Sequence, residues 1–389
     1  MKIALVVPHL CVGGMEAFVL RLGGYFLQHG EDVTVIATEQ PGEWWPRVAE
    51  LGMKGISLPL MSSFNRLSHV GRIHKALQEY DVLILNHSRY AQAALPGLPS
   101  NTVVIGVVHG DADVVYEVGC GNIEAMDALV AVSPKVRETT AARVGNGVVT
   151  QIFSGIPLQR CSTACRPSIS ASPKLVFVGR VDSQKGIFLL PEILTHLNQA
   201  GLHALLNIVG DGPDMPELKN RIARAGLDGQ VHYLGTLSSE DVARKLRESH
   251  ILVMPSFSEG FPIVPLEAQG NGCVPVVSYL PGITEPNVLG GVTGVFAECG
   301  NAKSFADAVL SLVNNPTTWQ TMSEAGMRRI REELSIEKMG DNYLALIERI
   351  RAQKQTANNA PRPGRIWNPK LIGYTAPLPT RLCKAIKIL

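Results

Sequence analysis

Residues 251–279, ILVMPSFSEGFPIVPLEAQGNGCVPVVSY, contain in one stretch the pattern on which the fold prediction rests. ILVMPS (251–256) and CVPVVSY (273–279) are short apolar runs, typical of strands buried on both faces of a parallel sheet. Between them an irregular Gly-Phe-Pro turn is followed by helical periodicity. The stretch therefore predicts a strand, a turn, a helix and a second parallel strand.

Similar runs recur on both sides of this stretch. The runs are KIALVV (2–7), DVTVIAT (32–38), DVLILN (81–86), VVIGVVH (103–109), ALVAVS (128–133), KLVFVGR (174–180), HALLNIVG (203–210) and VHYLG (231–235). Helical patterns separate or follow them, at 15–29, 186–200, 214–225, 239–247, 302–313 and 317–333. The polar stretch CSTACRPSISASP (161–173) divides the two series and is interpreted as a linker. This alternation predicts an α/β protein of two doubly wound, Rossmann-like halves facing one another across a cleft.

The composition excludes several classes of protein. The chain has 389 residues, of which 46% are apolar and 18% charged, so it is not a disordered or fibrous protein. Seven cysteines occur without a C-x-x-C pair, which indicates reduced thiols. The N-terminal sequence MKIALVV leads directly into a histidine and a Gly-rich turn, and no run of eighteen apolar residues occurs. We expect a cytoplasmic protein that does not span a membrane.

The basic residues are distributed unevenly. From Arg349 onward there are nine basic residues and no acidic ones, whereas the residues before it carry 27 basic against 34 acidic side chains. An acidic body argues against a nucleic-acid-binding protein, because such proteins carry positive charge on the folded surface. The basic tail needs a separate explanation.

Two groups of residues follow the first strand of each half, where ligands bind in open parallel sheets. Gly13 and Gly14 allow the backbone to approach a ligand closely where a helix begins, although a tight turn needs glycine too. Arg180 and Lys185 could clamp a diphosphate, although solvated surface cations would look the same.

The motif SEGFPIVPLEAQGNG (258–272) is the most informative. It places Glu259 in the turn after a strand and Glu267 about one turn into the next helix. A carboxylate at Glu267 is suited to accept hydrogen bonds from vicinal hydroxyls such as those of a ribose. A capped surface helix would not explain the apolar residues around it.

In these residues the sequence resembles the family 4 glycosyltransferases, retaining enzymes of the GT-B fold, over about residues 1–350. The resemblance rests on GGME (13–16), VSP (132–134), FVGRVDSQKG (177–186), IVGDGP (208–213), YLG (233–235) and the E-x7-E motif in SEGFPIVPLE. It implies an acceptor-side domain over 1–165, a nucleotide-sugar-binding domain over 166–340 and a return helix over 341–355, whereas the basic tail over 356–389 has no recognised counterpart in the family. The chain departs from the family at Ser154, where members often have Asn.

The resemblance also implies roles for individual residues. Arg180 and Lys185 would bind the nucleotide diphosphate and stabilise the charge of the leaving group. Glu259 would contact hydroxyls of the donor sugar, and Glu267 would bind the ribose. Phe261, Pro262 and Ile263 would lie along the sugar and diphosphate.

In the N-terminal half, Gly13 and Gly14 would let the diphosphate close against the first domain. His109 matches a family histidine that reaches the transferred sugar, whereas without the family match a histidine ending a buried strand is more often a core residue. His9 and His87 also follow strands and have less support as site residues.

Asp111 and Asp113 form a D-x-D pair, which in another glycosyltransferase fold holds a metal. Here the pair follows a strand of the first half, and Arg180 and Lys185 already supply the charge that a metal would. We therefore expect no metal requirement and no other cofactor.

The last residues carry a separate prediction. Helical spacing over 334–352 is followed by a Pro-rich and Gly-rich stretch and then by RLCKAIKIL (381–389), which could form a short basic amphipathic helix. Such a segment is suited to an anionic membrane surface, and folding of a flexible tail onto an acidic patch of the body is the alternative.

The sequence thus predicts a retaining glycosyltransferase that moves a hexose-like sugar from a nucleotide diphosphate donor to a hydroxyl acceptor. The expected acceptor is a glycan or a lipid-linked molecule of bacterial surface polysaccharide synthesis. The alternatives are a nucleotide-sugar epimerase, a sugar phosphorylase and a non-catalytic sugar-nucleotide-binding scaffold. The base, the sugar and the acceptor are not readable from the sequence.

Overall fold

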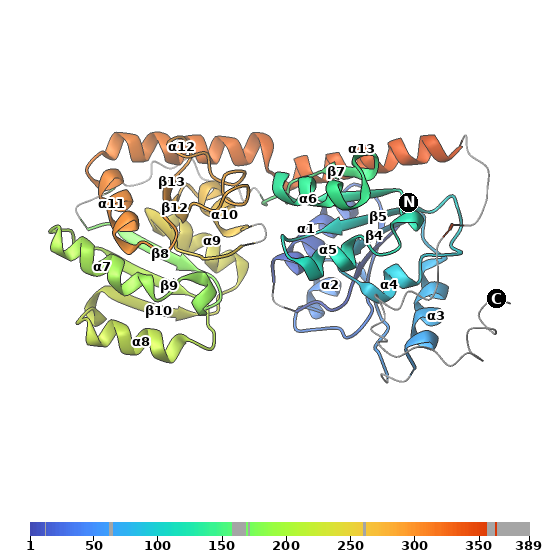
Figure 1. Cartoon of the computed structure of the whole chain (residues 1–389), viewed down its shortest axis with the longest axis horizontal. Helices are drawn as coiled ribbons and strands as arrows, with labels where there is room; N and C mark the ends of the chain where they lie inside the picture. Colours follow the sequence, from blue (N-terminus) through green and yellow to red (C-terminus); the bar gives the residue numbers. More distant parts are fainter. Residues whose placement is uncertain are drawn as a thin grey trace. The chain divides into compact units, whose positions relative to one another are not determined.

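The computed structural model describes residues 1–11, 13–61, 65–157, 169, 172–259, 262–355 and 362–363. These residues form two compact units (Figure 1). Unit 1 comprises Met1–Ala131, Arg137–Thr150 and the C-terminal segment from Tyr343, and unit 2 comprises Val132–Val136 and Gln151–Asn342. Within the described parts of the chain, no helix is long and apolar enough to cross a bilayer.

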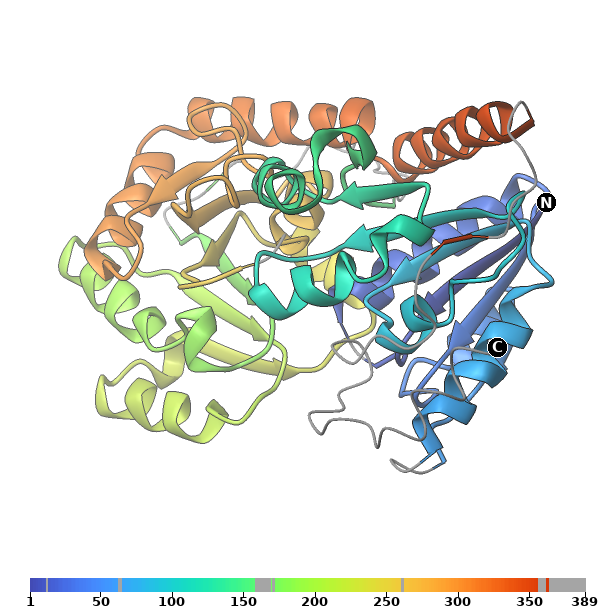
Figure 2. The same cartoon turned by 45° about the vertical axis from the view of Figure 1, so that its right-hand side comes forward.

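Unit 1 contains a parallel sheet that is doubly wound. In the described residues its strand order is β3-β2-β1-β4-β5-β6-β7. The strands of this sheet are drawn in blue to green in Figure 2. The strands are β1 (Lys2–Val7), β2 (Asp32–Ala37), β3 (Lys54–Ser57), β4 (Val82–Asn86), β5 (Val103–Val108), β6 (Ala128–Ala131) and β7 (Val149–Gln151). From β1 the chain proceeds to one side of the sheet, and from β4 to the other. The adjacent strands β1 and β4 therefore form the switch point of the sheet, the place where ligands bind in such folds.

Helices connect these strands. They are α1 (Gly14–Gln28), α2 (Pro46–Glu50), α3 (Arg66–Leu77), α4 (Arg89–Ala93), α5 (Asp113–Gly119) and α6 (Pro134–Val144). Helix α1 shows how the sequence sets a helix boundary. Its apolar face buries Phe18, Leu22 and Phe26, and Gly30 follows its end at φ +82°, a left-handed conformation that glycine adopts without steric cost.

Unit 2 contains a second doubly wound parallel sheet. Among the described residues its order is β10-β9-β8-β11-β12-β13, so β8 and β11 form its switch point. The strands are β8 (Lys174–Val178), β9 (Leu205–Val209), β10 (Val231–Gly235), β11 (Ile251–Met254), β12 (Val274–Ser278) and β13 (Val295–Ala297).

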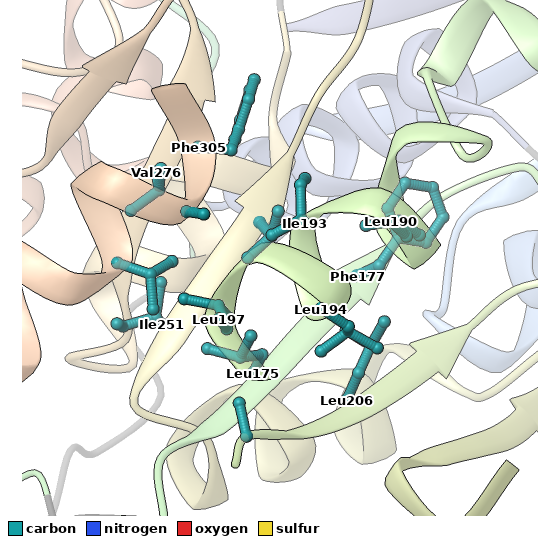
Figure 3. Close-up of a cluster of buried hydrophobic side chains, with 14 of the residues drawn as sticks. Leu175, Phe177, Leu190, Ile193, Leu194, Leu197, Leu206, Ile251, Val276 and Phe305 are labelled. Atoms are coloured by element: carbon teal, nitrogen blue, oxygen red, sulfur yellow. The ribbon is translucent and has the colours of Figure 1, made fainter. Parts of the chain in front are cut away.

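Both faces of this second sheet are covered by helices. They are α7 (Leu189–Gln199), α8 (Met215–Arg224), α9 (Ser239–Glu248), α10 (Val264–Gly270), α11 (Ala302–Val313) and α12 (Pro316–Glu333). Leu175 and Phe177 of β8 point into a large apolar core with Ile193 and Phe305 of the covering helices α7 and α11 (Figure 3). Val176 belongs to a smaller core on the other face, as the period of two along a strand requires.

The C-terminal segment joins unit 1. Helix α13 (Ile336–Gln355) begins in unit 2, and from Tyr343 it belongs to unit 1. Lys354 Nζ lies 2.8 Å from Asp127 Oδ1, and Arg362 donates to Asp127 Oδ2 at 2.7 Å and to the Ala125 carbonyl at 2.9 Å. The buried Arg362 side chain thus ties the chain after α13 to the loop before β6.

The structure confirms the predicted fold class of two doubly wound parallel sheets. It adds three strands that the sequence did not indicate. Strand β3 is exposed along its length, and β7 and β13 have three residues each, too few for a recognisable apolar run. Most of the predicted linker and nearly all of the predicted tail, including 381–389, lie outside the described residues.

Candidate functional site

The switch point of unit 2 brings together residues from two loops distant in sequence. Lys185 follows β8 and Glu259 follows β11, 74 residues later. The Lys185 ammonium lies 2.7 Å from each Glu259 carboxylate oxygen. Ser256 donates a further hydrogen bond to Glu259 Oε1 at 2.7 Å. The Glu259 side chain is only 9% exposed, so this carboxylate is held in one place by two donors.

The loop after β8 is fixed by a close approach to the loop after β11. The 3₁₀ turn Ser183–Lys185 ends at Gly186, which has φ +65°. A Cβ atom at Gly186 would lie 1.9 Å from the Pro255 carbonyl oxygen, so no other residue fits without moving the backbone. This contact accounts for the glycine that follows Lys185 in the motif.

Arg180 is connected to the same loop through Asp182. The Arg180 guanidinium pairs with the Asp182 carboxylate through Nε, and Asp182 Oδ1 accepts a hydrogen bond from the Lys185 backbone N–H at 3.1 Å. The Asp182 side chain is nearly buried, whereas that of Arg180 is 67% exposed. One carboxylate therefore organises both predicted cations and leaves Arg180 accessible to a ligand.

The remaining predicted residues of unit 2 lie at the start of α10. Pro262 is buried, and its carbonyl accepts a 2.6 Å hydrogen bond from the Asn287 side chain. Ile263 is the residue before the helix, and Glu267 lies in its first turn, partly exposed. Phe261 lies outside the described residues.

The switch point of unit 1 carries histidines. His9 follows β1, His87 follows β4 and His109 follows β5, on three adjacent strands. His87 has φ +53°, a strained conformation for a residue other than glycine and one that recurs at functional sites. Burial lowers the pKa of His87, with Arg89 and His9 adding to the effect.

His109 is held by two neighbours. Its Nε2 atom lies 2.9 Å from Asn86 Oδ1, and the Phe18 ring packs edge-on with ring centroids 4.9 Å apart. Burial, with a smaller effect of His87, lowers the pKa of His109 to about 3. The imidazole is therefore neutral at neutral pH.

Gly13 and Gly14 lie where α1 begins, Gly13 immediately before the helix and Gly14 as its first residue. The buried Glu16 carboxylate returns toward Gly13, and its Oε1 lies 3.5 Å from His9 Nδ1. Burial raises the pKa of Glu16. A carboxylate thus lies beside the Gly-rich turn, a feature that the sequence analysis did not identify.

Both carboxylates of the D-x-D pair have partners in unit 1. Tyr116 donates to Asp111 Oδ1 at 2.6 Å, and Asp113 pairs with Arg143 at 2.6 Å. These contacts account for both aspartates without a ligand.

The structure thus joins Lys185 to Glu259 and links Arg180 to them through Asp182. It places Gly13, Gly14 and His109 in unit 1. Sequence reasoning missed Asp182, Ser256 and Asn86. Asp182 could have been found as the cap of the short turn after Arg180, since Asp is a preferred capping residue, whereas the other two carry no local signal.

Comparison with known proteins identifies both halves of the chain. A model described as glycosyl transferases group 1 matches residues 167–329, and a model described as glycosyltransferase family 4 matches residues 12–160.

Curated relatives match parts of the chain. Glycogen synthase of Mycobacterium tuberculosis is 27% identical over 54% of this chain and 51% of its own length. The lipopolysaccharide core biosynthesis mannosyltransferase LpsB of Rhizobium meliloti is 28% identical over 59% of this chain and 67% of its own length. D-inositol 3-phosphate glycosyltransferase of Pseudarthrobacter chlorophenolicus is 33% identical over 40% of this chain and 38% of its own. In the first of these matches the chain spans about half the length of the relative.

Solved structures share the fold. Anabaena Alr3699/HepE in complex with UDP and glucose has a TM-score of 0.76 at 15% identity, covering 90% of this chain and 100% of that one. A glycosyltransferase from Rickettsia africae has a TM-score of 0.75 at 17% identity, covering 90% and 98%. At such identities the likeness shows the fold alone.

Proposed function

The chain belongs to the GT-B glycosyltransferases, whose two halves the group 1 and family 4 models describe. On this premise we propose that it transfers a hexose-like sugar from a nucleotide diphosphate donor to a hydroxyl acceptor, with retention at the anomeric carbon. The observation that carries the proposal is the cluster at the switch point of unit 2. There Lys185 and Glu259 are in contact, and Arg180 is held beside them by Asp182.

The chemistry of this cluster suits a sugar diphosphate. Arg180 and Lys185 supply positive charge for the diphosphate. Negative charge develops on the diphosphate when the sugar–phosphate bond breaks, and these cations would stabilise it. Glu259 is an ionisable acceptor suited to sugar hydroxyls. Among the described residues no second carboxylate is in contact with Glu259. In a reaction with retention, the leaving phosphate would therefore take the proton of the acceptor hydroxyl.

A binding experiment tests the donor. A nucleotide at a hundredfold its dissociation constant stabilises a folded protein by about 2.7 kcal/mol, which raises the unfolding midpoint measurably. We expect one nucleoside diphosphate among UDP, GDP, ADP and TDP to raise it. Glu267→Ala should lose most of that rise, because it removes the proposed ribose acceptor. Glu324→Ala, which changes an exposed carboxylate on α12, is the matched control. No response to any nucleotide would contradict the proposal.

The reaction products distinguish the alternatives. A transferase releases the nucleoside diphosphate in proportion to glycosylated acceptor, an epimerase converts the donor without net release, and a phosphorylase requires inorganic phosphate. NMR of the anomeric proton of donor and product reports retention directly. An inverted product would overturn the stereochemical part alone.

We propose that the reaction needs no metal. The partnered state of Asp111 and Asp113 and the two cations at the unit 2 switch point support this. Turnover should be unchanged in excess EDTA. Loss of turnover in EDTA that Mn²⁺ restores would contradict the proposal.

We propose further that the acceptor is a glycan or lipid-linked molecule of bacterial surface polysaccharide synthesis and that 356–389 contact an anionic membrane surface. The charge of this segment supports the proposal, with six basic and no acidic residues. Deleting 364–389, which keeps Arg362, should abolish pelleting with vesicles of anionic phospholipid. Equal pelleting of both proteins would remove the membrane proposal.

A further inference from the structure

The side chain of Asn86 has only one possible orientation. Asn86 is fully buried at the end of β4. Its Nδ2 atom lies 3.3 Å from the carbonyl oxygen of Val6 in β1 and 3.2 Å from that of Ile84 in its own strand. Carbonyl oxygens only accept hydrogen bonds, so the amide NH₂ must face them. The reversed amide would place three oxygens against one another.

This orientation determines the tautomer of His109. With Nδ2 engaged, Asn86 directs Oδ1 at His109 Nε2, 2.9 Å away. An amide oxygen cannot donate, so Nε2 must carry the proton and Nδ1 must carry the lone pair. The Phe18 ring packs edge-on against the imidazole, with the two ring centroids 4.9 Å apart. This packing restricts rotation of the imidazole about its hydrogen bond to Asn86.

His109 Nδ1 can therefore act only as a hydrogen-bond acceptor. Within the described parts of the chain no hydrogen bond to Nδ1 is found. Because the ring is neutral around pH 7, Nδ1 accepts a hydrogen bond and has no proton to donate to a phosphate or carboxylate. A hydroxyl group, the group that a sugar presents, is a suitable donor to it.

We propose that Asn86 is a positioning residue that holds His109 as the Nε2–H tautomer and so presents Nδ1 as the hydrogen-bond acceptor for a sugar hydroxyl. The choice of a sugar rests on the proposed function. The tautomer does not, because it follows from contacts within unit 1. The two parts are therefore tested by separate measurements.

The tautomer is measured by ¹H–¹⁵N NMR of the full chain with labelled histidine, with the His109 signals assigned through His109→Gln. We expect the wild-type ring to be protonated on Nε2. Asn86→Ala should give a mixture of tautomers or the Nδ1–H form, because it removes the oxygen that accepts a hydrogen bond from Nε2–H. A wild-type ring protonated on Nδ1 would overturn the proposal even if the mutants fail to fold.

The functional part is measured by steady-state kinetics with the donor identified as above. We expect Asn86→Ala to lower kcat/KM for the nucleotide sugar by about tenfold to a hundredfold, the size of the loss when a partner that orients a metal-bound histidine is removed. The Kd of the free nucleoside diphosphate should stay unchanged, since the proposal gives the ring a sugar hydroxyl as its partner. A merely structural defect would lower kcat/KM and would also weaken binding of the free nucleoside diphosphate.

A matched control is Gln92→Ala. It removes a buried amide that donates to the Gly119 carbonyl at 3.1 Å in the same unit. This variant should keep the His109 tautomer and the kinetic constants. If Asn86→Ala also keeps both, the positioning role is wrong. If the tautomer changes while the protein transfers no sugar in any form, the proposed function fails and the Asn86–His109 assignment stands.

Discussion

The two switch points occupy the same topological position and differ in chemistry. In unit 2 the loops after β8 and β11 bring opposite charges into contact, Lys185 against Glu259 with Arg180 nearby. In unit 1 the ends of β1, β4 and β5 carry histidines, one of them neutral and held by an amide. A doubly wound sheet therefore fixes where a ligand site lies, whereas the side chains after each strand decide whether it suits charge or hydroxyl groups.

The largest expected effect tests the charged half of this comparison. Arg180→Ala should lower kcat by about a hundredfold to a thousandfold, because it removes a donor to the charge that develops on the leaving phosphate. The measurement is the rate of nucleoside diphosphate release with acceptor present. Arg244→Ala, on the exposed face of α9 and paired with Asp241, is the matched control and should be silent. A fully active Arg180→Ala protein would contradict the role.

The Lys185–Glu259 contact gives the next largest effect. Lys185→Met should cost about 2 kcal/mol of unfolding free energy, because it removes the cation beside a nearly buried carboxylate and leaves the neutral Ser256 hydroxyl as its remaining donor in the described structure. Glu259→Gln in the Lys185→Met background should recover part of that loss. Urea unfolding of the two single mutants and the double mutant measures the coupling. Strictly additive effects would show that the contact contributes nothing to stability.

The histidines of unit 1 whose pKa values are lowered predict a smaller, pH-dependent effect. The pKa of His109 is lowered from 6.5 to about 3, and those of His69 and His87 are also lowered. Between pH 6.5 and 3 the unfolded chain therefore binds protons that the folded chain does not, so stability falls as the pH falls. His109 alone should contribute about 1.4 kcal/mol per pH unit in this window.

Unfolding midpoints at pH 7.0 and 5.0 measure this dependence. His109→Gln should lower the number of protons taken up on unfolding by about one. His203→Gln, at an exposed site of unit 2, should not change this number. An unchanged dependence in His109→Gln would show that the ring is not neutral in the folded protein.

The fold could be predicted from the sequence because buried parallel strands are near-continuous apolar runs. The long strands all show this signal, as KIALVV does for β1. Strand β3, KGIS, is an edge strand with every residue exposed, so tertiary pairing and not composition makes it a strand.

The candidate site could be predicted only in part. The position of a residue after a strand is visible in the sequence, which is why Lys185 and Glu259 could be named. Their contact depends on two loops that only the sheet brings together. The role of Asn86 depends on carbonyls of two strands, and a buried asparagine at a strand end carries no sequence signal of that kind.

The segmented construction of unit 1 bears on how the chain is made. Unit 2 is nearly continuous, whereas unit 1 requires Tyr343 onward, including the Arg362 that binds Asp127. During synthesis the first sheet therefore leaves the ribosome long before the segment that completes its unit, and unit 2 has all of its residues first. The N-terminal half of a nascent chain therefore stays incomplete until α13 and Arg362 have been synthesised, which is after every residue of unit 2.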